Sequence, residues 1–98
     1  MDINWDEMQE IAFIDLGEHW EYEVISVIQD PRTGKYFAGH DSGCSCTYPF
    51  EDMQQLSDWT EIRTKAEAVD FAKRHSSREF RADETAKFMG QLQQNWVD

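Results

Sequence analysis

The feature that most constrains this chain is the signature of a β-hairpin between Glu21 and Ala38. Residues 22–29 are rich in β-branched side chains, and their middle, VISVI, is apolar at both alternating sets of positions. A run of this kind, bounded by turn-forming residues, predicts a strand that is covered at least partly on both faces. The second strand is expected from Lys35 to Ala38.

The turn between these strands is predicted by residues 30–34, DPRTG. Asp30 can accept hydrogen bonds from backbone N–H groups ahead of it, and Pro31 presets φ at the next turn position. Gly34 can adopt the positive φ that a type I turn followed by a bulge requires.

The segments before the hairpin have weaker patterns. Ile3, Trp5 and Met8 fall near helical spacing, which predicts a loose helical start. A short strand near Ile11 to Ile14 is expected to join the sheet of the hairpin.

After the hairpin, residues 39–50 are expected to form a compact loop, because they hold two glycines, a proline and both cysteines. One or two helical turns are expected within residues 50–56, and a further strand at 59–63. Thr64 and Glu67 form a capping box that predicts a helix over residues 65–75. Its buried face is expected to hold Ala66, Val69 and Ala72, with Phe71 at the edge.

A last helix is predicted over residues 83–96, with Phe88, Met89, Leu92 and Trp96 on its apolar face. We therefore expect residues 1–98 to form a single α+β domain. In it, a small antiparallel sheet built on the hairpin at about 21–38 carries two C-terminal helices on one face.

The charge of the chain restricts its partners. The formal net charge is −11, and residues 1–31 hold nine acidic residues with no Lys or Arg. Direct binding to nucleic acid is disfavoured, since contact with phosphates needs basic side chains. An acidic surface also serves solubility alone, but it favours a partner with a basic surface. The candidate contact residues are the acidic Asp2, Asp6, Glu7 and Glu10 with the aromatic Trp5 and Trp20.

The cysteine-bearing loop offers the most reactive side chains. His40, Cys44 and Cys46 are of the types that bind zinc, and His19 or His75 could complete four ligands. A single C-x-C is a weak zinc signal, so two small cysteines packed beside the sheet are the preferred interpretation, with no metal or other cofactor. A Cys44–Cys46 disulfide remains a third alternative. Attack by Cys44 with His40 as base would need further site geometry, so we do not expect an enzyme.

Three short motifs also resemble a known group of proteins. The residues 30–37 (DPRTGKYF), 41–46 (DSGCSC) and 49–51 (PFE) are similar to a pattern in small proteins of actinobacterial phages, which have no assigned activity. The likeness covers about residues 20–75. It implies a phage or prophage origin.

These observations lead to one functional hypothesis and two alternatives. We expect a small acidic accessory protein that acts by protein–protein interaction on a host protein. The alternatives are an acidic mimic of nucleic acid that occupies the groove of a DNA-binding or defence protein, and a small zinc-binding domain that uses the loop from His40 to Cys46. No apolar run reaches the ~20 residues that span a bilayer, and residues 1–10 lack the features of a signal peptide. We therefore expect no membrane association and a location in the cytoplasm of the infected bacterium.

Overall fold

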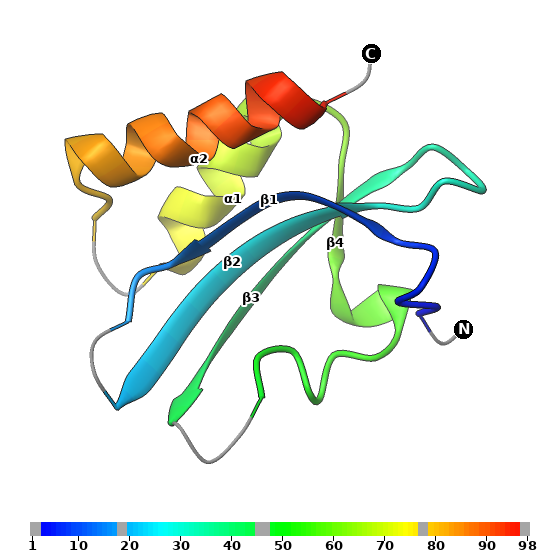
Figure 1. Cartoon of the computed structure of the whole chain (residues 1–98), viewed down its shortest axis with the longest axis horizontal. Helices are drawn as coiled ribbons and strands as arrows, with labels where there is room; N and C mark the ends of the chain where they lie inside the picture. Colours follow the sequence, from blue (N-terminus) through cyan, green and yellow to red (C-terminus); the bar gives the residue numbers. More distant parts are fainter. Residues whose placement is uncertain (1–2, 18–19, 45–47, 77–78, 97–98) are drawn as a thin grey trace.

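The hairpin forms the middle of a four-stranded antiparallel sheet in the computed structural model, which describes residues 3–17, 20–44, 48–76 and 79–96. The strands follow one another across the sheet in the order β1 (Gln9–Asp15), β2 (Glu21–Gln29), β3 (Tyr36–Cys44) and β4 (Thr60–Ile62). The helices α1 (Lys65–His75) and α2 (Ala82–Asn95) lie on one face of this sheet (Figure 1). The predicted α+β fold with two C-terminal helices is confirmed.

The turn of the hairpin has the predicted geometry. Gly34 lies at a φ of 75°. Its N–H donates to the carbonyl of Asp30 at 2.7 Å, and the Asp30 N–H donates to the carbonyl of Lys35 at 2.9 Å. The Asp30 carboxylate accepts from the N–H of Arg32 at 3.0 Å.

The second strand of the hairpin is longer than predicted. Residues 39–44, expected to begin a loop, continue β3 as far as Cys44, and the prediction of a loop is wrong for them. Each residue of β3 is paired with β2, from Tyr36 opposite Gln29 to Cys44 opposite Glu21. Glycine, Asp and Ser are poor strand formers, but the context of a neighbouring strand outweighs that preference.

The predicted helical start is also wrong. Residues 5–7 form a turn instead, and β1 begins at Gln9, so the strand expected near 11–14 is confirmed and longer. The N–H of Ile3 donates to the carbonyl of Gln54 at 2.6 Å, which ties the N-terminal segment to a distant loop.

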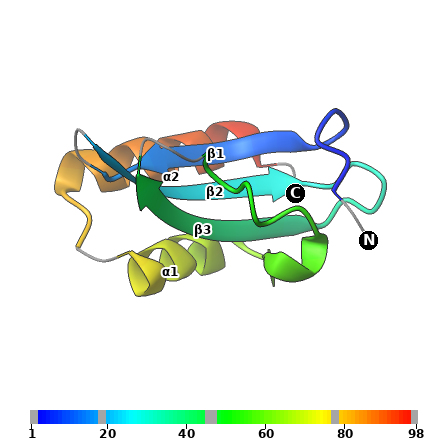
Figure 2. The same ribbon diagram turned by 90° about the horizontal axis from the view of Figure 1, so that it is seen from below.

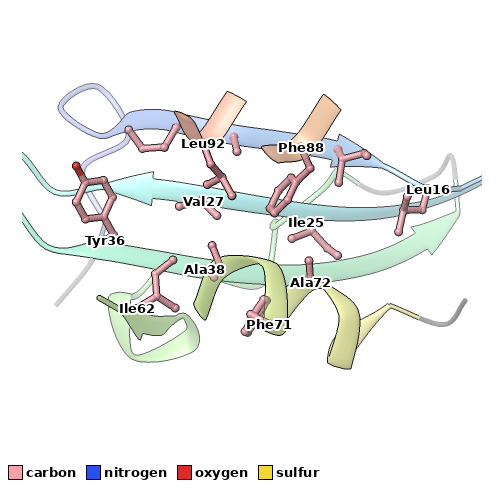
Figure 3. Packing of buried hydrophobic residues seen from close by; sticks show 14 residues of the cluster. Leu16, Ile25, Val27, Tyr36, Ala38, Ile62, Phe71, Ala72, Phe88 and Leu92 are labelled. Carbon is pink, nitrogen blue, oxygen red and sulfur yellow. The ribbon is translucent and has the colours of Figure 1, made fainter. Parts of the chain in front are cut away.

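The main core lies between the sheet and the two helices (Figure 3). Helix α1 has the predicted bounds, and its cap Thr64 accepts from the N–H of Glu67 at 3.1 Å. Its buried face differs from the prediction: Ala68, Phe71 and Ala72 are buried, whereas Ala66 is exposed.

Helix α2 buries Phe88 and Leu92 in the same core, but Met89, expected on that face, is exposed. Trp96 follows the last helical residue, and its ring stacks on that of Tyr36 with centroids 3.7 Å apart. This contact fixes the end of α2 over the start of β3.

The opposite face of the sheet has its own apolar cluster, covered by the N-terminal segment and by residues 48–59 (Figure 2). Its buried members are Ile3, Val24, Ile28, Phe37, Phe50 and Trp59. The helical turns expected within 50–56 are replaced by a turn at 49–52 and a 3-10 helix, η1 (Leu56–Asp58). The strand expected at 59–63 is present as β4.

Candidate interaction surface

The predicted contact residues near the N-terminus gather beside the hairpin turn. Trp5 is 40% exposed, its ring stands edge-on to Trp59, and its indole N–H donates to the Gln54 side chain at 2.7 Å. Asp6, Glu7 and Glu10 are exposed. Asp2 lies outside the described residues.

The charge of this N-terminal surface is partly compensated. The guanidinium of Arg32 lies 3.7 Å from the Glu7 carboxylate and 3.5 Å from that of Asp30. The Arg32 and Glu7 side chains are each nearly half exposed, so the pair contributes little to stability. It nevertheless lowers the negative field that this end of the sheet presents to a partner.

Trp20, the other predicted aromatic contact, lies at the opposite end of the sheet. It directly precedes β2, whereas Glu10 pairs with Ile28 near the far end of that strand. Eight strand steps of about 3.3 Å separate these ends by roughly 26 Å. The predicted contact residues therefore form two separate surfaces.

The end of the sheet that carries Trp20 holds an acidic cleft that the sequence did not indicate. The cleft has a volume of about 260 Å³. It is lined by residues of β2, of β3 and of the turn that follows: Tyr22, Asp41, Ser42, Gly43, Cys44, Tyr48, Glu51 and Asp52. Three of these side chains are carboxylates and none is basic. Trp20 and Tyr48 are 78% and 77% exposed, the largest exposures among the large apolar side chains that the structure describes.

Hydrogen bonds hold one wall of the acidic cleft in place. Asp41 accepts from the N–H of Phe50 at 2.7 Å and from that of Ser42 at 2.9 Å. The hydroxyl of Tyr22 donates to the carbonyl of Tyr48 at 3.3 Å. Phe50 has a φ of 64°, an uncommon value for a bulky residue, and its buried ring packs 4.8 Å from that of Trp59. The turn that carries Tyr48, Glu51 and Asp52 is therefore attached to β3 through Asp41 and to β2 through Tyr22.

His40 lies on the other face of the sheet from the acidic cleft. Its Nε2 is 3.1 Å from a carboxylate oxygen of Glu23, and both side chains are largely buried. The rings of His75 and Phe71 continue this cluster, with His75 lying 6.4 Å from His40 and 4.2 Å from Phe71 between centroids. His40 thus joins β3 to α1.

This geometry separates two of the candidate zinc ligands, His40 and Cys44. His40 and Cys44 are four residues apart on one strand, about 13 Å along it, and side chains stand roughly perpendicular to a sheet. Ligands of one zinc ion lie within about 2.3 Å of it. No group of three or more potential metal ligands occurs within the described ranges.

Cys44 is disulfide-bonded, so the expectation of a reduced, packed thiol is wrong at this position. The other cysteine of the chain, Cys46, lies outside the described residues, as does His19. With its sulfur in a disulfide, Cys44 has no thiolate with which to bind zinc or attack a substrate.

The chain belongs to a family that is described as Domain of unknown function (DUF7574), whose model matches residues 3–95. No curated protein and no solved structure matches it. Of the helices in the described part of the chain, none is long and apolar enough to cross a bilayer.

Proposed function

We propose that this protein acts by binding a partner protein that has a basic surface, and not by catalysis. The observation that carries the proposal is the acidic cleft, where Glu51 and Asp52 stand beside the exposed ring of Tyr48. Exposed tyrosine and tryptophan side chains are frequent anchors of protein interfaces. Carboxylates around such anchors favour partners that present Lys or Arg.

The size of the acidic cleft supports a side chain as its occupant. Small-molecule sites usually have volumes of about 300–1,000 Å³, and this cleft, at about 260 Å³, lies close to the small end of that range. A lysine or arginine head group could meet the carboxylates and also stack on a tyrosine ring. The net charge of −11 extends the attraction beyond the cleft and would speed association at low salt.

The biological setting that we propose is that of a small phage or prophage accessory protein acting on a host protein in the cytoplasm. The resemblance of the hairpin and cysteine motifs to small phage proteins supports this origin. Inhibition of a DNA-binding or defence protein by mimicry of nucleic acid is one form that such an interaction could take.

The test is capture of partners from bacterial lysate by the immobilised protein, over a series of salt concentrations. We expect a basic partner whose capture decreases as salt rises, because exposed charges are screened over about 10 Å at 0.1 M. Reversal of Glu51 and Asp52 to Lys should abolish the capture. The matched variant reverses two exposed acids of the N-terminal surface, Asp6 and Glu10.

The two variants and one competitor separate the possible outcomes. Loss of capture only in the N-terminal variant would move the interface to the hairpin end. Release of the partner by duplex DNA would identify mimicry of nucleic acid. Unchanged capture in both variants would show that the acidic residues serve solubility alone, which would contradict the proposal.

A further inference from the structure

The two edges of the sheet are closed to different extents. Strand β1 forms one edge, and side chains of α2 bind its outward backbone groups. The Gln91 side chain accepts from the N–H of Phe13 at 2.7 Å, and the Asn95 side chain donates to the carbonyl of Ile11 at 3.0 Å. A further strand could pair here only by breaking these two hydrogen bonds, so this edge is closed.

The other edge is only partly covered, because β4 is much shorter than β3. Strand β4 pairs with residues 36–38 of β3, whereas β2 pairs with all of β3. Residues 39–44 of β3 therefore extend past the end of β4. Within this segment Ser42 is exposed, and His40 is partly buried.

The direction of the backbone groups in this segment follows from the ladder. In an antiparallel pair, successive residues point their N–H and C=O groups alternately toward and away from the partner strand. The N–H of Phe13 points away from β2, since it donates to the Gln91 side chain of α2. Ser26 is opposite Phe13 in the ladder, so the backbone N–H and C=O groups of Ser26 point toward β3. There they form hydrogen bonds with Gly39. The backbone groups of His40 and Ser42 must then point away from β2. A second hydrogen bond supports this direction. Glu23 is opposite Ser42 in the ladder, and the Glu23 carbonyl points toward β1, where it accepts from the N–H of Leu16.

Within the described residues, no strand meets the outward groups of His40 and Ser42. The N–H of Ser42 donates to the side chain of the preceding Asp41. Edge groups that no neighbouring strand pairs with are a template for an added strand. The N–H of Ser42 would exchange its bond to the Asp41 side chain for one to that strand. We name residues 40–43 of β3, with these outward groups, the open edge.

We infer that the open edge receives an extended, basic segment of the partner protein as a fifth strand of the sheet. This inference rests on the proposed function and specifies its binding mode. Main-chain hydrogen bonds to His40 and Ser42 would supply the part of the affinity that does not depend on the sequence of the segment. Contacts with its side chains would supply the specificity.

The chemistry of the segment follows from what borders the open edge. The acidic cleft shares Asp41, Ser42 and Gly43 with it, and Glu51 and Asp52 stand on the same face. Side chains of an added strand alternate between the two faces of the sheet. Those on the cleft face would be Lys or Arg, and those on the helix face would be apolar, to lie near the rings of Phe71 and His75.

A second copy of this chain is a poorer occupant of the open edge. Pairing two such edges would bring both acidic clefts together and would join two molecules of net charge −11. Like charges placed opposite each other on paired strands are destabilising. A basic partner gains from the same charges.

The test uses three seven-residue peptides with capped ends and the full-length protein at low salt. The first peptide alternates Lys and Val, the second has Glu in place of Lys, and the third keeps every Lys but has Pro in place of two Val residues. We expect the first peptide to bind at least roughly tenfold more tightly than the other two. Nuclear magnetic resonance should show slower amide hydrogen exchange at His40, with chemical shift changes at Ser42 and Gly43.

Two variants of one residue provide the matched control. Ser42→Pro places a ring where the outward N–H stood, while the pairing of β2 with β3 does not use that N–H. It should weaken binding of the Lys–Val peptide by roughly tenfold or more. Ser42→Ala keeps the N–H and removes only the hydroxyl, so it should weaken binding much less than Ser42→Pro; equal losses in the two variants would contradict the role of the backbone N–H. Circular dichroism of both variants checks that the fold is retained.

Other results would overturn the inference. Shift changes confined to Asp6, Glu7 and Glu10 would move the interface to the N-terminal surface. Equal binding of the proline-containing peptide would mean that charge alone attracts the segment. The proposed function would then stand without the fifth strand. No binding of either basic peptide at about 1 mM would overturn the inference, and the capture experiment would decide the proposed function independently. A dimer in solution that Ser42→Pro dissociates would assign the open edge to a second copy.

Discussion

Replacement of Gly39 by Ala should destabilise the protein, although a strand interior normally favours Ala over Gly. Gly39 lies in β3 directly beneath the ring of Trp59. A β-carbon built at Gly39 would stand 2.5 Å, 2.6 Å and 2.9 Å from the Cε3, Cζ3 and Cδ2 atoms of that ring. Carbon atoms in contact normally lie about 3.5–4.0 Å apart. The ring would therefore have to move by roughly 1 Å.

The surroundings of Trp59 resist this movement. The side chain is buried between Phe50 and Trp5, and its indole N–H donates to the carbonyl of Met53 at 3.0 Å. Overpacking of a core costs about 1–3 kcal/mol, and a weakened hydrogen bond adds up to about 1 kcal/mol. The lower entropy of the unfolded chain offsets about 0.4–1 kcal/mol. The net loss should be about 2 kcal/mol, which corresponds to a decrease in Tm of about 8–16 °C for a domain of this size.

Urea and thermal unfolding followed by far-ultraviolet circular dichroism would measure this loss without depending on tryptophan fluorescence. Gly90→Ala is the matched control, because a β-carbon there meets nothing within 4 Å and the helix should gain about 0.5–1 kcal/mol. In a double-mutant cycle, Trp59→Phe should reduce the cost of Gly39→Ala. A neutral or stabilising Gly39→Ala would refute the close packing of Trp59 on β3.

Four further outcomes are expected. Gly34→Ala should lower the free energy of unfolding by about 1 kcal/mol, because Gly34 has a positive φ. Thr33→Ala should lower it less, since it loses only an exposed 3.3 Å hydrogen bond from the Lys35 N–H. Equal, negligible changes in the unfolding midpoint would contradict this account of the turn. Thr64→Ala should cost about 1 kcal/mol in chemical unfolding and Thr64→Ser little, because only Ala removes the cap of α1. Purified protein should carry far less than one zinc per chain, and Cys44 should react with a thiol reagent only after reduction; near-stoichiometric zinc that is lost in Cys44→Ser would contradict both statements. Reversal of Asp6 and Glu10 to Lys should change the free energy of unfolding by no more than about 0.5 kcal/mol, since both are exposed; a larger loss would assign them a structural role.

The parts of the fold that sequence predicts well are those with a local physical cause. The turn at Asp30 to Gly34 depends on residues within five positions of one another, and it has the expected geometry. The start of α1 depends on Thr64 and Glu67, and the bounds of that helix match. Its buried face does not, because contact with the sheet, and not helix periodicity alone, selects Ala68 in place of Ala66.

Elements that depend on distant partners escape the same reasoning. The N-terminal segment has the spacing of a helix, yet its Ile3 N–H bonds to Gln54 and its Trp5 ring contacts Trp59. These contacts join residues about fifty positions apart, and no local pattern predicts them.

The candidate surface was predictable only in part. The sequence predicts Trp20 as a contact residue, and the structure places it exposed at one end of the sheet. No sequence pattern predicts Tyr48, Glu51 and Asp52 as contact residues, because they join the acidic cleft only after the chain turns back on β3. The hydrogen bond from the Phe50 N–H to Asp41, nine residues earlier, fixes that return, and a loop composition contains no signal for it.

The composition that made residues 39–44 resemble a loop is also what an uncovered edge requires. A long apolar edge strand invites aggregation, and proteins avoid it with short, charged or irregular edges. Here the uncovered part of β3 carries Asp41, Ser42 and Gly43 in place of the β-branched residues of β2. Such an edge has backbone groups for pairing but little apolar side-chain area, so that it should pair only where the partner supplies complementary charge. The poor strand propensity of this segment and its proposed selectivity for a basic strand therefore have the same physical origin.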